Sequence, residues 1–155
     1  MTVFSAGYDH AAAIDTKGTL YTWGNNDKGQ LGQGDYNVRS VPTKVKLTYE
    51  AVNVWCGNKA TIVQTSDGKV YVFGDNSNYL LGMKTRSDIV NTPTENEYLS
   101  GTTIDKIELQ NDFAIALIGN QVWGWGINSV GRLSTCGSTV KYPEVLSDKL
   151  VSISD

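Results

Sequence analysis

The 155-residue sequence is poor in the residue types that carry most enzyme chemistry. It has one histidine, His10, and two cysteines, Cys56 and Cys136, which occupy non-equivalent positions in the chain. A catalytic triad, a histidine–cysteine metal site or a disulfide framework each needs partners that are missing here. We therefore expect a protein that is not an enzyme and has no metal and no cofactor, and we mildly favour a reducing compartment.

Basic charge and long hydrophobic runs are also missing. The net charge is −3 and the pI is about 5.1, which argues against a surface built for nucleic acid. No hydrophobic run approaches the ~20 residues of a membrane-spanning helix, so we expect no membrane partner. The N-terminal residues lack the pattern of a signal peptide. We predict a cytoplasmic or nuclear protein, or a secreted one if a signal peptide precedes Met1.

What the sequence does contain is an internal repeat. An aromatic residue followed by glycine occurs at Trp23, Phe73 and Trp125, at intervals of about 50 residues. Prolines recur with nearly the same period later in each repeat, at positions 42, 93 and 143. A period of this length is typical of propellers, solenoids and arrays.

Each repeat reads as four short strands joined by turns. The first strands are expected at 3–6, 52–56 and 104–109, the second at 10–14, 61–64 and 113–117, and the third at 19–24, 69–74 and 121–126. Second and third strands are hydrophobic at successive positions, as in sheets packed on both faces. The proline-containing fourth strand belongs at an outer edge, because proline cannot donate to a ladder. We predict an all-β fold, a partial (open) β-propeller of three four-stranded antiparallel blades.

The repeat boundaries follow from this phase. Residues 1–50, 51–102 and 103–149 form the three repeats of a single propeller domain or fragment, and 150–155 begin a further repeat. Three blades cannot close a ring, because propellers have ~4–8 blades. Two interpretations remain open: a piece of a longer array, or a short chain that completes a ring with other copies. Either leaves hydrophobic faces at the terminal blades and favours self-association through open blade edges.

The residues of the first repeat closely resemble those of the regulator of chromosome condensation family. The matching positions are Gly7, His10, Asp15, Gly18, Leu20, Tyr21, Trp23, Gly24, Asn26, Gly29, Gln30, Leu31, Gly32 and Gly34. The second and third repeats depart from the pattern, with Ala60 and Phe113 at the histidine position and Gln110 at the first glycine. The resemblance covers essentially the whole chain and implies kinship with seven-bladed closed rings.

The resemblance also implies a binding site. In the founding members, acidic and histidine residues in the turn after the first strand line the propeller face that grips a small GTPase. By residue type, Asp9, His10 and Asp112 match this position. The projecting wedge that the family uses for nucleotide exchange has no counterpart here, and neither has its basic tail.

Other candidate sites have simpler structural interpretations. Residues 25–27 before Gly29 lack the first acid of a calcium loop and are interpreted as a turn. The strand aromatics are interpreted as core, and His10 as a half-buried residue that satisfies backbone groups at a strand start. The basic residues Arg39, Lys44 and Lys46 are interpreted as a solvated edge.

We therefore predict a non-enzymatic protein–protein interaction module that presents turns on one rim of a propeller. Three alternatives remain: a guanine-nucleotide exchange factor for a small Ran-like GTPase, a secreted bacterial inhibitor or adhesin, and a structural subunit of a larger assembly.

Overall fold

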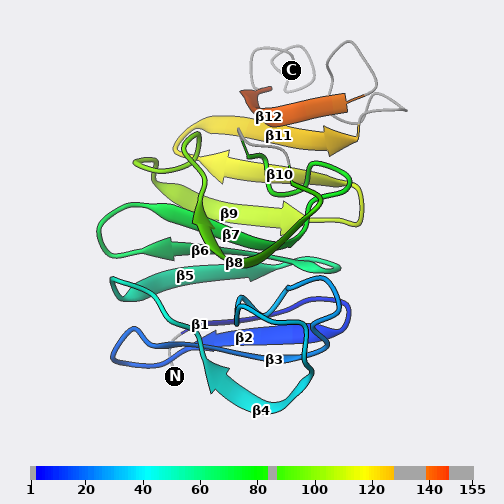
Figure 1. Ribbon diagram of the computed structural model, residues 1–155. Coiled ribbons are helices and arrows are strands. Elements are labelled where there is room, and N and C mark those ends of the chain that lie inside the picture. Colours follow the sequence, from blue (N-terminus) through cyan, green and yellow to red (C-terminus); the bar gives the residue numbers. More distant parts are fainter. Residues whose placement is uncertain (1–2, 84–86, 128–138, 147–155) are drawn as a thin grey trace.

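The computed structural model describes residues 3–83, 87–127 and 139–146. Twelve strands in this part of the chain form three four-stranded antiparallel sheets, stacked face to face (Figure 1). Each sheet uses four consecutive strands in sequence order, so each is one meander. The fold class is therefore the one predicted, an open stack of propeller blades that does not close on itself.

The strand boundaries agree with expectation to within two residues. Blade 1 consists of β1 (Val3–Ala6), β2 (His10–Ile14), β3 (Leu20–Gly24) and β4 (Arg39–Lys44). Blade 2 consists of β5 (Ala51–Cys56), β6 (Ala60–Thr65), β7 (Val70–Asp75) and β8 (Ile89–Glu95). Blade 3 consists of β9 (Ile104–Leu109), β10 (Phe113–Ile118), β11 (Gln121–Ile127) and β12 (Thr139–Val145). The expected strand start at 150–155 lies outside the described residues.

The strands β1, β5 and β9 lie at the inner edge, where β5 contacts both of the other two. The prolines Pro42, Pro93 and Pro143 lie in β4, β8 and β12, at the outer edge of each sheet. An edge strand tolerates a residue without an N–H on its solvent side, which explains the periodic proline.

Burial on both faces holds only for the middle blade. Every residue of β6 is buried, whereas β2 and β10 alternate between buried and less buried residues. The expectation of two buried faces is therefore wrong for blades 1 and 3 within the described residues. The reason is position in the stack, since each outer blade has a neighbour on one side only.

The aromatic–glycine pairs have a geometric cause that recurs in every blade. Gly24, Gly74 and Gly126 have φ of 111°, 118° and 113°, a region that other residues rarely adopt. A Cβ at any of them would lie within 3.0 Å of the carbonyl oxygen of the turn between the first two strands. The next residue donates its N–H to that same oxygen, at 2.7–2.9 Å. Glycine is thus required for the third strand to pack against the turn.

A buried asparagine then holds the following loop. In blade 1, Asn26 accepts the N–H of Leu31 at 3.1 Å and donates to the carbonyl of Asp35 at 3.0 Å. In blade 2, Asn76 accepts the N–H of Leu81 at 3.0 Å and donates to the carbonyl of Ser87 at 2.9 Å. The loop of residues 25–35 is therefore built as a rigid turn, as the sequence suggested.

Of the candidate core aromatics, only Trp125 is fully buried, with 0% of its surface exposed. Its indole N–H donates to the carbonyl of Leu80 at 2.6 Å, which joins blade 3 to blade 2. Phe73 fills the equivalent place between blades 1 and 2 and is also fully buried. The other four, Tyr21, Trp23, Tyr71 and Trp123, are half-buried.

Candidate functional site

The turns between the first and second strands of each blade lie on one rim of the stack. They are closed by equivalent hydrogen bonds, from Gly7 to His10, from Gly57 to Ala60 and from Gln110 to Phe113, at 2.8–2.9 Å. The predicted site residues Asp9, His10 and Asp112 therefore share a rim. Asp9 and His10 belong to the blade 1 turn, and the blade 2 turn separates them from Asp112.

His10 lies beneath this rim and is 4% exposed. Its Nε2 is 2.9 Å from the Thr61 hydroxyl of β6, and that hydroxyl donates to the carbonyl of Gln30 at 2.8 Å. The expectation of a half-buried histidine that satisfies backbone groups at its strand start is thus replaced by a buried one that joins blade 1 to blade 2. A buried side chain has no surface to offer a partner, so any role of His10 in binding is exerted through the position of its turn.

Burial also sets the charge of His10. Loss of solvation lowers its pKa from 6.5 to about 4, and the nearby Asp9 carboxylate opposes that shift only in part. Asp9 Oδ1 lies 3.8 Å from Nδ1 of His10, which is too far for a hydrogen bond. The Nδ1 atom is buried and has no hydrogen-bond partner. His10 is therefore neutral at physiological pH.

Asp9 is held by a polar cluster rather than free at the rim. It accepts hydrogen bonds from the amide of Asn25 at 2.9 Å and from that of Gln30 at 3.3 Å, and it lies 3.5 Å from the Lys59 ammonium. Lys59 comes from blade 2 and also bonds Asp27 at 2.9 Å. This hydrogen bond lowers the pKa of Asp27 and raises that of Lys59.

The exposed surface of the rim is formed by other residues. Tyr8 is 82% exposed, and the Asn58 amide donates to the Asn111 side chain across blades 2 and 3. An open hollow of about 620 Å³ lies between these turns. Its wall is formed by Ala6, Gly7, Tyr8, Cys56, Gly57, Asn58, Lys59, Glu108, Leu109, Gln110 and Asn111.

Sequence reasoning missed Tyr8, Asn58 and Lys59. Gln30 carries a signal because it stands in the glycine-rich segment. The positions equivalent to Lys59 in the other blades are Asp9 and Asp112, so the repeat does not predict a basic residue there. Only the stacking of blade 2 on blade 1 brings Lys59 to the two aspartates.

Reactive groups are scarce in the part of the chain that the structure describes. Burial raises the pKa of the Cys56 thiol to about 12, which keeps it protonated and unreactive. No group of three or more histidine, cysteine, aspartate and glutamate side chains there is arranged to hold a metal ion. No helix in this part is long and apolar enough to cross a membrane.

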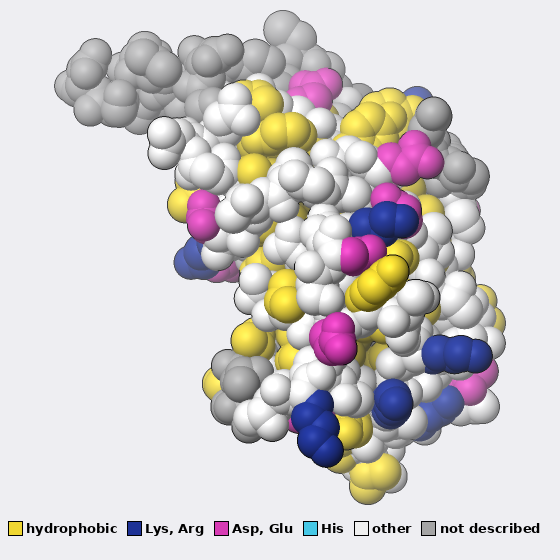
Figure 2. Space-filling view, turned by 90° about the vertical axis from the view of Figure 1, so that its left-hand side faces the viewer, with side chains coloured by type: hydrophobic (Ala, Val, Ile, Leu, Met, Phe, Trp, Pro, Cys, Tyr) yellow, Lys and Arg dark blue, Asp and Glu magenta, His cyan; other side chains and the backbone are white. Residues whose placement is uncertain are grey.

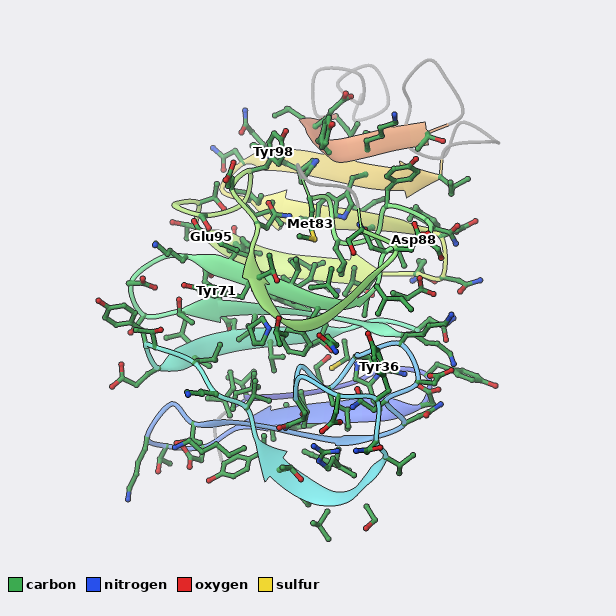
Figure 3. The ribbon with its side chains drawn as sticks, in the orientation of Figure 1. Tyr36, Tyr71, Met83, Asp88, Glu95 and Tyr98 are labelled. Atoms are coloured by element: carbon green, nitrogen blue, oxygen red, sulfur yellow. The ribbon has the colours of Figure 1, made fainter. Side chains whose placement is uncertain are left out.

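The other surfaces are of mixed character. A second hollow, of about 530 Å³, follows the outer strand β8, and Met83 and Glu95 in its wall come from blade 2 (Figure 3). On the rim opposite the candidate site, basic, acidic and hydrophobic side chains are interspersed (Figure 2). The basic residue Arg39 is paired with Asp35 at 2.8 Å.

These features define the class as a β-propeller array whose blades are joined by buried polar contacts under one rim. The family model described as "Regulator of chromosome condensation (RCC1) repeat" matches residues 17–64 and 67–117, and a second model of the same description matches residues 2–30. The chain belongs to the RCC1 repeat family.

Known proteins agree with this assignment. The human E3 ubiquitin-protein ligase HERC2 is 34% identical over 148 residues, covering 92% of this chain and 3% of that protein. A Xenopus laevis RCC2 homologue is 34% identical over 127 residues, covering 80% of this chain and 25% of its own length.

Among solved structures, human WBSCR16 is 25% identical with a TM-score of 0.79, covering 92% of this chain and 36% of that one. Prp20p of Saccharomyces cerevisiae is 18% identical with a TM-score of 0.77, covering 92% and 37% of the two chains. The chain thus spans a quarter or less of these curated relatives and little more than a third of these solved propellers.

Proposed function

We propose that this chain is a non-enzymatic protein-interaction module, and that it binds its partner with the rim of turns at residues 7–9, 57–59 and 110–112. One observation carries the proposal: a highly exposed tyrosine and paired asparagines surround an open hollow of about 620 Å³. Tyrosine supplies contact area at low entropic cost and is enriched at interfaces. The cytoplasmic or nuclear location stays a prediction.

The predicted site residues take two roles in this proposal. Asp9 and His10 fix the height and orientation of the blade 1 turn through Lys59 and Thr61. Asp112 and Tyr8 contribute from the turns themselves. A rigid scaffold under the turns favours binding, because less conformational entropy is lost when the partner docks.

A photo-crosslinking experiment tests the proposal. A photoreactive amino acid is placed at Tyr8, on the rim, or at Tyr49, which is 51% exposed beside the Ala51 end of β5, at the opposite rim. We expect discrete protein adducts in cells from position 8, and their loss when Asn58 and Asn111 are replaced by alanine. Adducts from position 49 alone, or equal labelling from both, would overturn the assignment of the rim.

A guanine-nucleotide exchange factor is the second candidate, because the Prp20p structure is described together with that protein's binding to Gsp1p and histones. The test is the release of labelled GDP from a Ran-like GTPase, with and without the chain. Stimulated release that falls about tenfold in Asp112→Ala, and is unchanged in Tyr49→Ala, supports exchange activity. Absence of stimulation rejects exchange and leaves the crosslinking test of the module unaffected.

A further inference from the structure

Tyr79 has an unusual backbone conformation in the loop that follows β7. Its φ is 61°, and it is the only residue other than glycine with a positive φ in the part of the chain that the structure describes. The equivalent residue of blade 1 is Gly29, with a φ of 74°. Each donates its N–H to the carbonyl of the buried asparagine three positions earlier, at 3.0 Å for Tyr79 and 3.1 Å for Gly29. The repeat therefore requires this conformation, and it costs a tyrosine free energy that a glycine does not lose.

The residue that faces this position also differs between the two blade junctions. Between blades 1 and 2, a Cβ at Gly29 would lie 2.7 Å from the Cα of Asn91 in β8, so no side chain fits there. Between blades 2 and 3, the position equivalent to Asn91 is Lys141 in β12. The Lys141 ammonium lies 5.8 Å from the centroid of the Tyr79 ring, within the range of a cation–π contact. Glycine with asparagine at one junction is thus replaced by tyrosine with lysine at the other.

This tyrosine–lysine pair borders the binding rim. The side-chain amide of Asn78, the residue before the tyrosine, lies 3.5 Å from the carbonyl of Asn111 in the blade 3 turn. Lys141 lies near the start of β12, whose first residue pairs with Ile127. The N–H of Ile127 donates to the carbonyl of Asp112 in the same turn, at 2.7 Å. The pair therefore lies beside the blade 3 turn, toward the outer strand.

Both side chains of the pair reach the surface. Tyr79 is half-buried and Lys141 is exposed. The Lys141 ammonium has no ion pair among the described residues, whereas Lys59, at the other junction, binds two aspartates. An aromatic ring beside an uncompensated positive charge suits an acidic side chain, because the carboxylate binds the ammonium while its methylene groups pack on the ring.

We propose that Tyr79 and Lys141 form a subsite for an acidic side chain of the partner that docks on the rim. This inference rests on the proposed function, since the subsite continues the surface formed by Tyr8, Asn58 and Asn111. The tyrosine is then held in a strained conformation because its ring contacts the partner. Strained residues cluster at functional sites, and tyrosine is enriched among the residues that dominate binding energies.

Tyr79→Gly separates binding from stability, because it introduces the residue that blade 1 has at this position. Binding is read from the protein adducts that a photoreactive amino acid at position 8 forms in cells. We expect the thermal midpoint to rise by about 2–4 °C as the strain is relieved. The adduct yield should fall about tenfold. A lower midpoint would make Tyr79 a structural contact between blades, and an unchanged yield would remove it from the binding surface; either result overturns the proposal.

Two variants of Lys141 test the charge of the partner. Lys141→Met keeps an aliphatic side chain beside the ring and removes the charge, so the adduct yield should fall about threefold. Lys141→Glu reverses the charge and repels an acidic side chain, so we expect a much larger loss. Equal yields from the two variants would show that the partner presents no acidic group here.

Tyr98→Gly is the matched control for Tyr79→Gly. The Tyr98 ring stacks on Tyr142 of β12 with 5.0 Å between centroids, so it also joins blades 2 and 3. Tyr98 follows the end of β8 that lies away from the binding rim, whereas Asp88 precedes the other end (Figure 3). We expect a lower thermal midpoint and an unchanged adduct yield. A loss of adducts as large as that of Tyr79→Gly would show that any disturbance of this junction weakens binding, which would contradict a specific subsite.

The same adducts separate this inference from the proposed function. If the otherwise unchanged chain gives no adducts from position 8, the binding rim and the subsite are rejected together. If adducts persist at full yield in Tyr79→Gly, the subsite alone is rejected. Direct contact is checked by placing the photoreactive amino acid at position 79, which should give adducts of the same mass as position 8. Adducts of other masses only, or none, would contradict the subsite.

Discussion

At the scale of single residues, the burial of His10 couples stability to pH. Its folded pKa of about 4 lies below the unfolded value of 6.5, so the unfolded chain binds the proton more tightly. The contribution of His10 to the free energy of unfolding is complete above about pH 6.5 and is lost as the pH falls toward 4. At ~1.4 kcal/mol per pKa unit, the loss is up to about 3 kcal/mol.

Urea denaturation at pH 7.0 and pH 4.5 measures this loss. His10→Gln, which keeps a polar side chain near Thr61 without a titrating group, should show a smaller difference between the two pH values. The carboxylate of Asp27 does not interfere, because its lowered pKa places its effect below 3.8. An equal pH dependence in His10→Gln would show that other groups dominate.

The interface around Asp9 shows what sequence reasoning can and cannot supply. Residue type and motif placed Asp9 and His10 in a rim turn. They did not reveal that Lys59 and Thr61 of the next blade bind these two residues, across 50 and 51 positions of sequence. Such a contact depends on the stacking of two repeats, whereas a motif describes one repeat.

At the scale of the strand and its turn, the aromatic–glycine step admits a direct test. Gly74→Ala places a methyl group against the backbone of Lys59 and Ala60 at a φ of 118°. Because backbone atoms cannot move aside as a flexible side chain would, we expect a loss of about 3 kcal/mol in the free energy of unfolding.

Gly68→Ala is the matched control for Gly74→Ala. Gly68 also has a positive φ, of 85°, but a Cβ there meets nothing within 4 Å. Only the conformational cost remains, of about 1–2 kcal/mol. Chemical denaturation of the two variants separates the cost of the steric clash from the conformational cost. Equal losses of stability would show that the close approach of Gly74 to the turn contributes nothing.

Strand positions were predictable because each element carries its own signal. Hydrophobic residues at successive positions and turn glycines locate the second and third strands, and proline locates the outer one, as Pro93 in β8 illustrates. Burial was not predictable in the same way. The sequence of β2 is at least as hydrophobic as that of β6, yet only β6 has a blade on each side.

At the scale of the whole molecule, this asymmetry predicts a gradient of local stability. In repeat arrays, each unit is stabilised by its own contacts and those with its neighbours, so the unit with two neighbours opens least. Blade 2 has neighbours on both faces, and the rim contacts of Lys59 and Asn58 tie it to blades 1 and 3.

Hydrogen exchange measured by mass spectrometry tests this gradient of local stability. Amides of β6 and β7 should exchange most slowly, and those of β2 and β10 should exchange faster because one face of each outer blade is uncovered. Lys59→Met removes the charge that joins blade 2 to Asp27 and Asp9, and it should speed exchange in β2 more than in β10. Because exposed ion pairs contribute at most about 1 kcal/mol, the expected change is a few-fold in rate. Uniform exchange across the three blades would mean instead that they open as one cooperative unit.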